Sequence, residues 1–202
     1  MSVSISKQQL TDLSQQIDEL LAPVPKWLST VRRPKLPYGR YRYYPSSSRP
    51  WCMYATVSGL IIEHRLGLSE AWTASQRAEA LGGLLDCQDA EDGYFHCPVC
   101  RVDNSDPRKR CSEDNVAGMT KKAVAALHAL DAEPKHPLPL DENTIPHPVD
   151  KWLEEVFEEH DPYSAGSIVG HLLGVRNQAL MARGRKPTED SVVHSVLKWL
   201  AA

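Results

Sequence analysis

The chain has 202 residues, of which 42% are hydrophobic, and a formal net charge of −3 at pH 7. This length and composition can supply a substantial buried core, so we expect a folded globular protein. The charge is small and the basic residues are scattered, apart from a cluster between Arg32 and Arg42, so we expect no nucleic-acid partner.

The first 21 residues lack the cationic start and the continuous apolar stretch of a secretory signal. No apolar run approaches the roughly 20 residues that a membrane-spanning helix needs. We therefore expect a cytoplasmic protein without a membrane span.

The N-terminal region predicts two helices and a long loop. Ser6 and Gln9 have the spacing of a capping box, and the apolar residues that follow lie on one helical face: Leu10, Leu13, Ile17, Leu20 and Leu21. Two prolines end this helix, and a short helix is expected around Trp27. Residues 33–50, rich in Pro, Arg and Tyr, predict a loop.

Six further helices are expected along the rest of the chain. Residues 51–66, ended by Gly67, and residues 73–88, begun by Thr73 with Gln76, should form a helical hairpin. Helical periodicity returns at 116–130, 152–157 and 168–175, and a last helix is expected to begin at Thr188.

No alternating run of β-branched residues favours a strand, so the sequence predicts an all-α fold. We expect one helical domain over residues 1–202, with an N-terminal helix and loop in 1–50 and stacked helical hairpins in 51–202. A Cys-rich loop, 87–111, interrupts the hairpins. Irregular loops between the helices favour a toroid or barrel of hairpins over a short-repeat solenoid.

The segment from Leu84 to Phe95, which contains Gln88, Gly93 and Tyr94, resembles the turn between hairpins in α/α toroids of the terpenoid cyclase and protein prenyltransferase type. In such a turn the Gln amide can bond backbone groups, Gly allows an unusual backbone angle and an aromatic side chain closes the gap. The chain has four residues between Gln88 and Gly93 where the family pattern has three. The resemblance implies a toroid-like fold, complete or partial, with a cavity for an isoprenoid or carbohydrate substrate.

A cysteine pair, Cys97 and Cys100, has the spacing of a zinc knuckle. Cys111 together with Cys87, or with His96 as the alternative ligand, could complete a tetrahedral Zn²⁺ site. The competing interpretations are that these cysteines are free thiols, with Cys87 buried as a small apolar residue, or that they form a disulfide.

Two acids beside Gly93, Asp89 and Asp92, are candidate catalytic residues, because they resemble the Asp-rich motif of alkene-protonating cyclases. A proton donor of this kind must be buried to stay neutral, whereas acids in a turn are normally solvated. Tyr41, Tyr43 and His171 are candidate substrate-binding residues, against the alternative that they only pack between helices.

Two functions remain open at this point. One is a toroid-like domain that binds or transforms a small organic molecule or glycan. The other is a noncatalytic helical module, stabilised by a zinc knuckle, that binds a protein partner. A deep pocket lined by acids and aromatics would favour the enzyme, and a flat apolar groove would favour the module.

Overall fold

The computed structural model describes residues 6–32, 35–47, 49–99, 116–140, 145 and 148–201. These residues form helices joined by loops, and the pairings outside helices are two isolated antiparallel bridges, Arg32 with Tyr41 and Gln88 with Phe95. The prediction of an all-α protein is confirmed. Among the described helices, none has the length and apolar character to cross a membrane.

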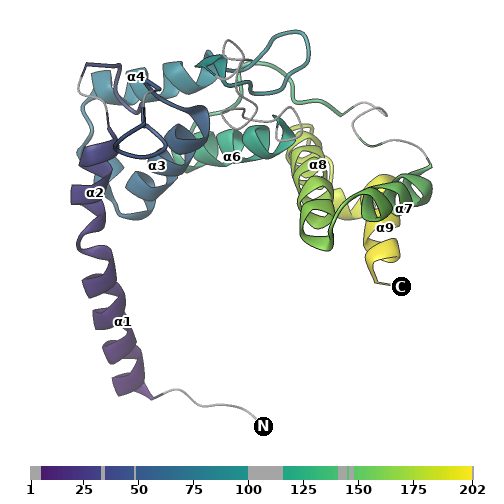
Figure 1. The fold of residues 1–202 in the computed structure, drawn as a ribbon, viewed down its shortest axis with the longest axis horizontal. Helices are drawn as coiled ribbons and strands as arrows, with labels where there is room; N and C mark the ends of the chain where they lie inside the picture. Colours follow the sequence, from purple (N-terminus) through teal and green to yellow (C-terminus); the bar gives the residue numbers. More distant parts are fainter. Residues whose placement is uncertain are drawn as a thin grey trace.

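The first helix, α1 (Lys7–Leu21), projects away from the other helices (Figure 1). It begins at the predicted capping box, in which the Ser6 hydroxyl accepts the Gln9 N–H at 3.2 Å and the Gln9 side chain accepts the Ser6 N–H at 2.8 Å. Its apolar face, which the residue spacing predicts, is not buried against another described part of the chain. Every residue of α1 is exposed, Leu20 to 74%. Capping depends on neighbours in sequence, whereas burial needs a second surface.

Helix α2 (Val24–Val31) turns toward the body of the protein and buries Leu28 and Val31. Helix α3 (Met53–Arg65) ends just before Gly67, whose φ of +70° is the left-handed angle expected of a glycine at this position. A short 3-10 helix, η1 (Leu68–Ala71), leads to α4 (Ala74–Leu85), which starts at the predicted Thr73 and Gln76 capping box. Since α3 contacts α4, the predicted hairpin is present.

Helix α6 (Val116–Ala129) lies in the middle of the molecule, against α3 on one side and α8 (Pro162–Ala182) on the other. Its buried residues go almost all round the helix. Together with α2, α3 and α4 it forms the central core, whose largest buried side chains are Leu28, Tyr41, Met53, Leu60, Leu84, Phe95, Leu127 and Leu130.

A second buried cluster, the C-terminal core, lies where α7 (Val149–Glu159) and α9 (Ser191–Leu200) meet the first half of α8. Its buried members are Ile145, Val149, Leu153, Val156, Ala165, Val169, Val192 and Val196. Helix α8 links the two cores, because Ala165 and Val169 belong to this cluster and Ala179 to the central core.

The last helix begins later than the sequence predicted. We expected its start at Thr188, but Pro187–Glu189 form a 3-10 helix, η5, and α9 starts at Ser191. Asp190 decides this boundary, because its carboxylate accepts the Val193 N–H at 3.1 Å and also pairs with Arg176 of α8 at 2.9 and 3.0 Å. The pairing with Arg176 holds the cap in a buried position that local sequence does not reveal.

Candidate functional site

The turn after α4 has the interactions that the sequence predicted for it. The Gln88 amide donates to the carbonyl oxygens of Gly93 at 3.0 Å and His136 at 2.8 Å, and its oxygen accepts the His136 N–H at 2.9 Å. Gly93 has a φ of +73°, and a Cβ there would collide with the Pro137 carbonyl oxygen. Phe95 is fully buried. Gln88 thereby ties this turn to the segment that follows α6.

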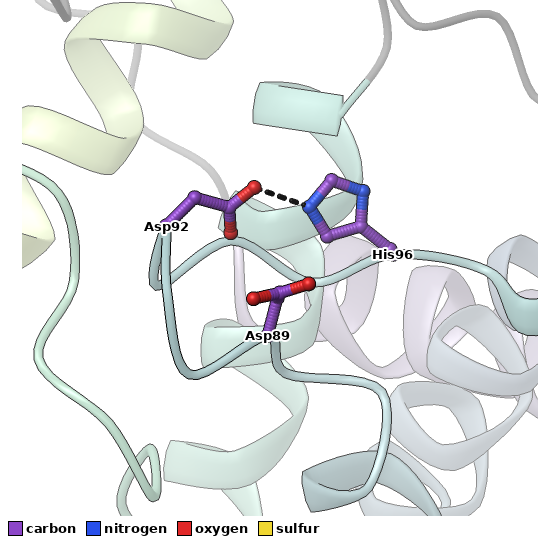
Figure 2. A group of neighbouring side chains, drawn as sticks. All are labelled: Asp89, Asp92 and His96. Atoms are coloured by element: carbon purple, nitrogen blue, oxygen red, sulfur yellow. Dashed lines mark hydrogen bonds and ion pairs between the residues drawn. The ribbon is translucent and has the colours of Figure 1, made fainter.

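The candidate catalytic acids lie in the same turn (Figure 2). One oxygen of Asp89 accepts the Glu91 N–H, and one oxygen of Asp92 accepts the Tyr94 N–H, each at 2.8 Å. The second oxygen of Asp92 lies 2.7 Å from His96 Nε2. Both carboxylates therefore stabilise the turn, as acids in such turns commonly do.

Asp89, Asp92 and His96 could hold a metal ion, since each places one ligand atom within 4.8 Å of the other two. Asp92 is exposed and Asp89 half-buried, however, and the hydrogen bond between Asp92 and His96 already accounts for the approach of these two side chains. Among the described residues this group, rather than a set containing Cys87 or Cys97, is the one that brings three ligand atoms together.

Two of the predicted zinc ligands, Cys87 and Cys97, are buried near each other beneath the turn. The Cys87 thiol donates to the Gly83 carbonyl at 3.3 Å, and Cys97 Sγ accepts the Met53 N–H at 3.5 Å. Burial raises the pKa of Cys87 to about 12, an effect that Arg40 opposes and Cys97 reinforces. The other two predicted ligands, Cys100 and Cys111, lie outside the described residues.

In the tyrosine-rich loop, Tyr41 and Tyr43 have different surroundings. Tyr41 is 1% exposed, and its hydroxyl accepts a hydrogen bond from Arg32 at 3.0 Å. Burial raises its pKa to about 12, although the neighbouring guanidinium opposes this. Tyr43 is 59% exposed. Both line a small pocket of about 180 Å³ over α2 and α3, to which Tyr54 also contributes.

Beside Tyr41 lies a buried charge that we did not single out from the sequence. Glu63 of α3 is 1% exposed and forms an ion pair with Arg32. A signal for it exists, because Glu63 continues the buried spacing of Val57 and Leu60 on one face of the helix. An acid on such a face predicts a buried cationic partner, but the spacing does not identify which residue that is.

The third predicted substrate-binding residue, His171, lines a larger cleft of about 910 Å³ between α3, α6, α7 and α8. The described lining combines aromatic and apolar groups with potential hydrogen-bond donors: Tyr54, Tyr94, Val116, Ala117, Lys122, Val156, His160, Tyr163, Ser164, Ser167, Ile168, His171 and Leu172. No carboxylate occurs among these described lining residues. The described part of the lining thus has positive or neutral polar groups set among apolar ones.

The charges around this cleft act on His171. Desolvation by burial lowers the pKa of its imidazole below the usual value, and the positive charges of Lys121 and Lys122 lower it further. Lys122 Nζ lies 3.7 Å from the centroid of the Tyr54 ring. This cation–π contact holds the ammonium group at the cleft.

Compared with known proteins, the chain matches no family model, no curated protein and no solved structure.

The predicted site residues therefore fall into separate places. Tyr41 and Tyr43 share one pocket, His171 lines the large cleft, and Asp92 lines a further groove of about 820 Å³ formed by the turn, residues 137–140 and Arg183. Sequence reasoning missed Lys122. No spacing pattern marks one of two adjacent lysines as the partner of an aromatic ring on another helix.

Proposed function

We propose that this chain is a helical binding domain whose large cleft takes an organic anion with an apolar part. The observation that carries this proposal is the cleft lining, which contains Lys122, His160 and His171 and no carboxylate among the described residues. A cation in a partly desolvated cleft favours phosphate, sulfate or carboxylate groups. The apolar lining from Val156, Ile168 and Leu172 would hold the rest of the ligand.

This lining fits both substrate classes implied by the resemblance to α/α toroids. An isoprenoid diphosphate has an anionic head and an apolar tail, and a phosphorylated sugar has an anionic head and hydroxyl groups for the serines. Toroid-like packing of the hairpins is part of this proposal. Binding is favoured over catalysis, because the candidate acids Asp89 and Asp92 do not belong to the described lining of this cleft and take part in the turn.

Calorimetric titration of the full chain tests the proposal. Geranyl diphosphate and glucose 6-phosphate are compared with their uncharged counterparts, geraniol and glucose. We expect a phosphorylated ligand to bind and its neutral counterpart to bind at least about tenfold more weakly, because a charged hydrogen bond contributes about 1.5–3 kcal/mol. Binding of the neutral compound with equal affinity would contradict the role of the cations.

Lys122→Ala should weaken binding of the phosphorylated ligand by at least about tenfold. The matched control is Lys198→Ala, which removes an exposed lysine of α9. Equal affinity of the two variants would overturn the proposed site, and failure of every ligand would overturn the proposed ligand class.

The pH dependence gives a second readout. Because the pKa of His171 is lowered, its imidazole is neutral at pH 7 and gains a proton only as the pH falls below its usual pKa. Anion binding should then tighten at acidic pH, and His171→Ala should reduce this change.

A zinc-stabilised, noncatalytic interaction module is the second candidate. It is favoured by the burial of Cys87 next to Cys97, which starts the predicted knuckle. Protein purified without chelator should contain stoichiometric zinc, and Cys97→Ser and Cys100→Ser should remove it, whereas Cys52→Ser should retain it. Comparing Cys87→Ser with His96→Ala then identifies the fourth ligand. Zinc-free wild-type protein would eliminate this candidate.

A further inference from the structure

Helix α1 combines a well-formed start with an apolar face that no described residue of the chain covers. Leu10, Leu13 and Leu20 are 53%, 52% and 74% exposed, and Ile17 is 45% exposed. A helix of 15 residues is at best marginally stable in water without a packing partner. The apolar side chains therefore point to a partner outside the folded body.

The spacing of this face is that of a coiled-coil seam. Leu10, Leu13, Ile17 and Leu20 alternate steps of three and four residues, which is the a and d pattern of a heptad. In the sequence the same spacing continues to Val24 and Trp27 of α2, but Val24 packs against the central core and only Trp27, 49% exposed, stays uncovered. A stripe this narrow fits one facing helix better than a broad protein surface.

The residues beside the seam indicate which helix could be the partner of α1. The flanking e and g positions are occupied by Gln9, Ser14, Gln16 and Leu21, which carry no charge, while Lys7 in the first turn is charged. In coiled coils that select a different partner, charges at these positions set the choice. An identical helix would meet no row of like charges here.

The polar face argues against a membrane as the partner. It carries Asp12, Asp18 and Glu19, while helices that lie on anionic lipid surfaces are rich in Lys and Arg on that face. In a coiled coil of two identical helices these three acids occupy outer positions, away from the seam.

We propose that α1 pairs with α1 of a second copy of this chain through the seam formed by Leu10, Leu13, Ile17 and Leu20. The inference is independent of the ligand proposed for the cleft, because α1 does not line that cleft. It makes the protein a dimer joined at an arm, with the helical bodies outside the contact.

Sedimentation equilibrium of the full chain over a wide concentration range tests the pairing. Wild type should self-associate to a dimer, and Ile17→Asp should weaken the association by more than about tenfold, equivalent to 1.4 kcal/mol or more. The bodies of both proteins should melt at the same temperature, since no residue of α1 is buried in either core. A wild type that stays monomeric at every concentration would overturn the proposal.

A charge-swap experiment distinguishes pairing through α1 from association through a different surface. A Glu variant carries Gln9→Glu, Ser14→Glu and Gln16→Glu, and a Lys variant carries Lys at the same three positions. Each should be monomeric, and an equimolar mixture should form a mixed dimer, whether the helices run parallel or antiparallel. Glu and Lys are good helix formers. Circular dichroism of each variant checks that α1 stays helical, because Lys at position 9 removes the acceptor of the Ser6 N–H.

The control variant places the same three charges on the outer face through Gln8→Glu, Thr11→Glu and Gln15→Glu, and it should dimerise like wild type. If all variants formed dimers equally well, the proposed pairing through the seam would be wrong, because another surface would then hold the dimer together. Binding to vesicles of anionic phospholipid that Ile17→Asp abolishes, without self-association, would instead identify a membrane as the partner and overturn the proposal.

Discussion

Helices α1 and α6 show how two helices with good periodicity can meet different fates in one chain. The apolar and polar residues lie on more sharply separated faces in α1 than in α6, yet no residue of α1 is buried. In α6 the separation is weaker, and eight residues are buried, among them Met119, Val124 and Leu127. Helix α6 contacts α3 and α8 along its length, whereas α1 projects away from the body (Figure 1).

This difference indicates what an amphipathic pattern does and does not specify. A sharp apolar stripe is typical of a helix with one covered face, and a helix that is apolar nearly all round is typical of the interior. The pattern specifies the width of the contact surface. It does not specify whether the covering surface belongs to the same molecule.

The largest effect should come from a contact between packed helices that α1 lacks. Asp190→Ala leaves the Arg176 guanidinium, which lies in a residue only 8% exposed, without its carboxylate partner. Breaking a buried ion pair in this way costs about 3–5 kcal/mol. Urea unfolding of the C-terminal core, followed by tryptophan fluorescence, measures the loss. The matched control is Asp150→Ala in the exposed first turn of α7, which should change stability by less than about 1 kcal/mol.

The comparison of α1 with α6 can be made directly with one substitution in each. Leu127→Ala in α6 removes a fully buried side chain and should lower the free energy of unfolding by about 2–5 kcal/mol. Leu13→Ala in α1 should change the unfolding of the monomeric body by less than about 0.5 kcal/mol. Urea titrations at low protein concentration provide both values. Equal losses would mean that α1 packs on the body in solution.

A smaller loss is expected where α3 meets the tyrosine-rich loop. A Cβ at Gly59 would lie 2.7–2.8 Å from the Tyr41 ring, and that ring is buried. Gly59→Ala should therefore destabilise the central core by about 1–3 kcal/mol through overpacking. Gly166→Ala on α8, where nothing lies within 4 Å, is the control and should be neutral or slightly stabilising. Thermal melts of both variants decide the matter.

The smallest effect is a dependence of folding stability on pH that arises where α8 and α9 pack together. The hydrogen bonds and the charge of Arg176 hold the pKa of Asp190 below its usual value. Its contribution to stability is therefore complete above the unfolded-state pKa of about 3.9 and is lost as the pH falls through the lower folded-state pKa. The stability difference between wild type and Asp190→Asn should shrink in that acidic range. A difference that stays constant with pH would show that the charge of Asp190 is not involved.

Local features of this protein could be predicted well from the sequence. The capping boxes at Ser6 and Thr73, the glycine at position 67 and the turn organised by Gln88 all agree with the structure. Each depends on hydrogen bonds or backbone angles within a few residues, so the sequence contains the information directly. The error at Thr188 has the opposite cause, because the cap at Asp190 is held in place by a residue 14 positions away.

The candidate site was predictable only in part. The sequence pointed to His171, Tyr41 and the acids near Gly93, but it could not tell that they lie in three different places. Lys122 and Glu63 gain their roles from Tyr54 and Arg32, which belong to other elements. The order of the chain does not encode such neighbours in a form that spacing can reveal.

From the sequence alone one can predict that this protein is helical, the bounds of α1, α3, α4 and α6 to within a few residues, and the apolar face of α1. Only the folded chain shows that α6 is enclosed while α1 is exposed, that Arg176 meets Asp190, and that Lys122 and His171 line one cleft. The difference lies in the separation along the chain over which each kind of interaction acts. Helix formation and capping join residues three or four positions apart, whereas burial and charge pairing depend on surfaces that only the folded chain brings together.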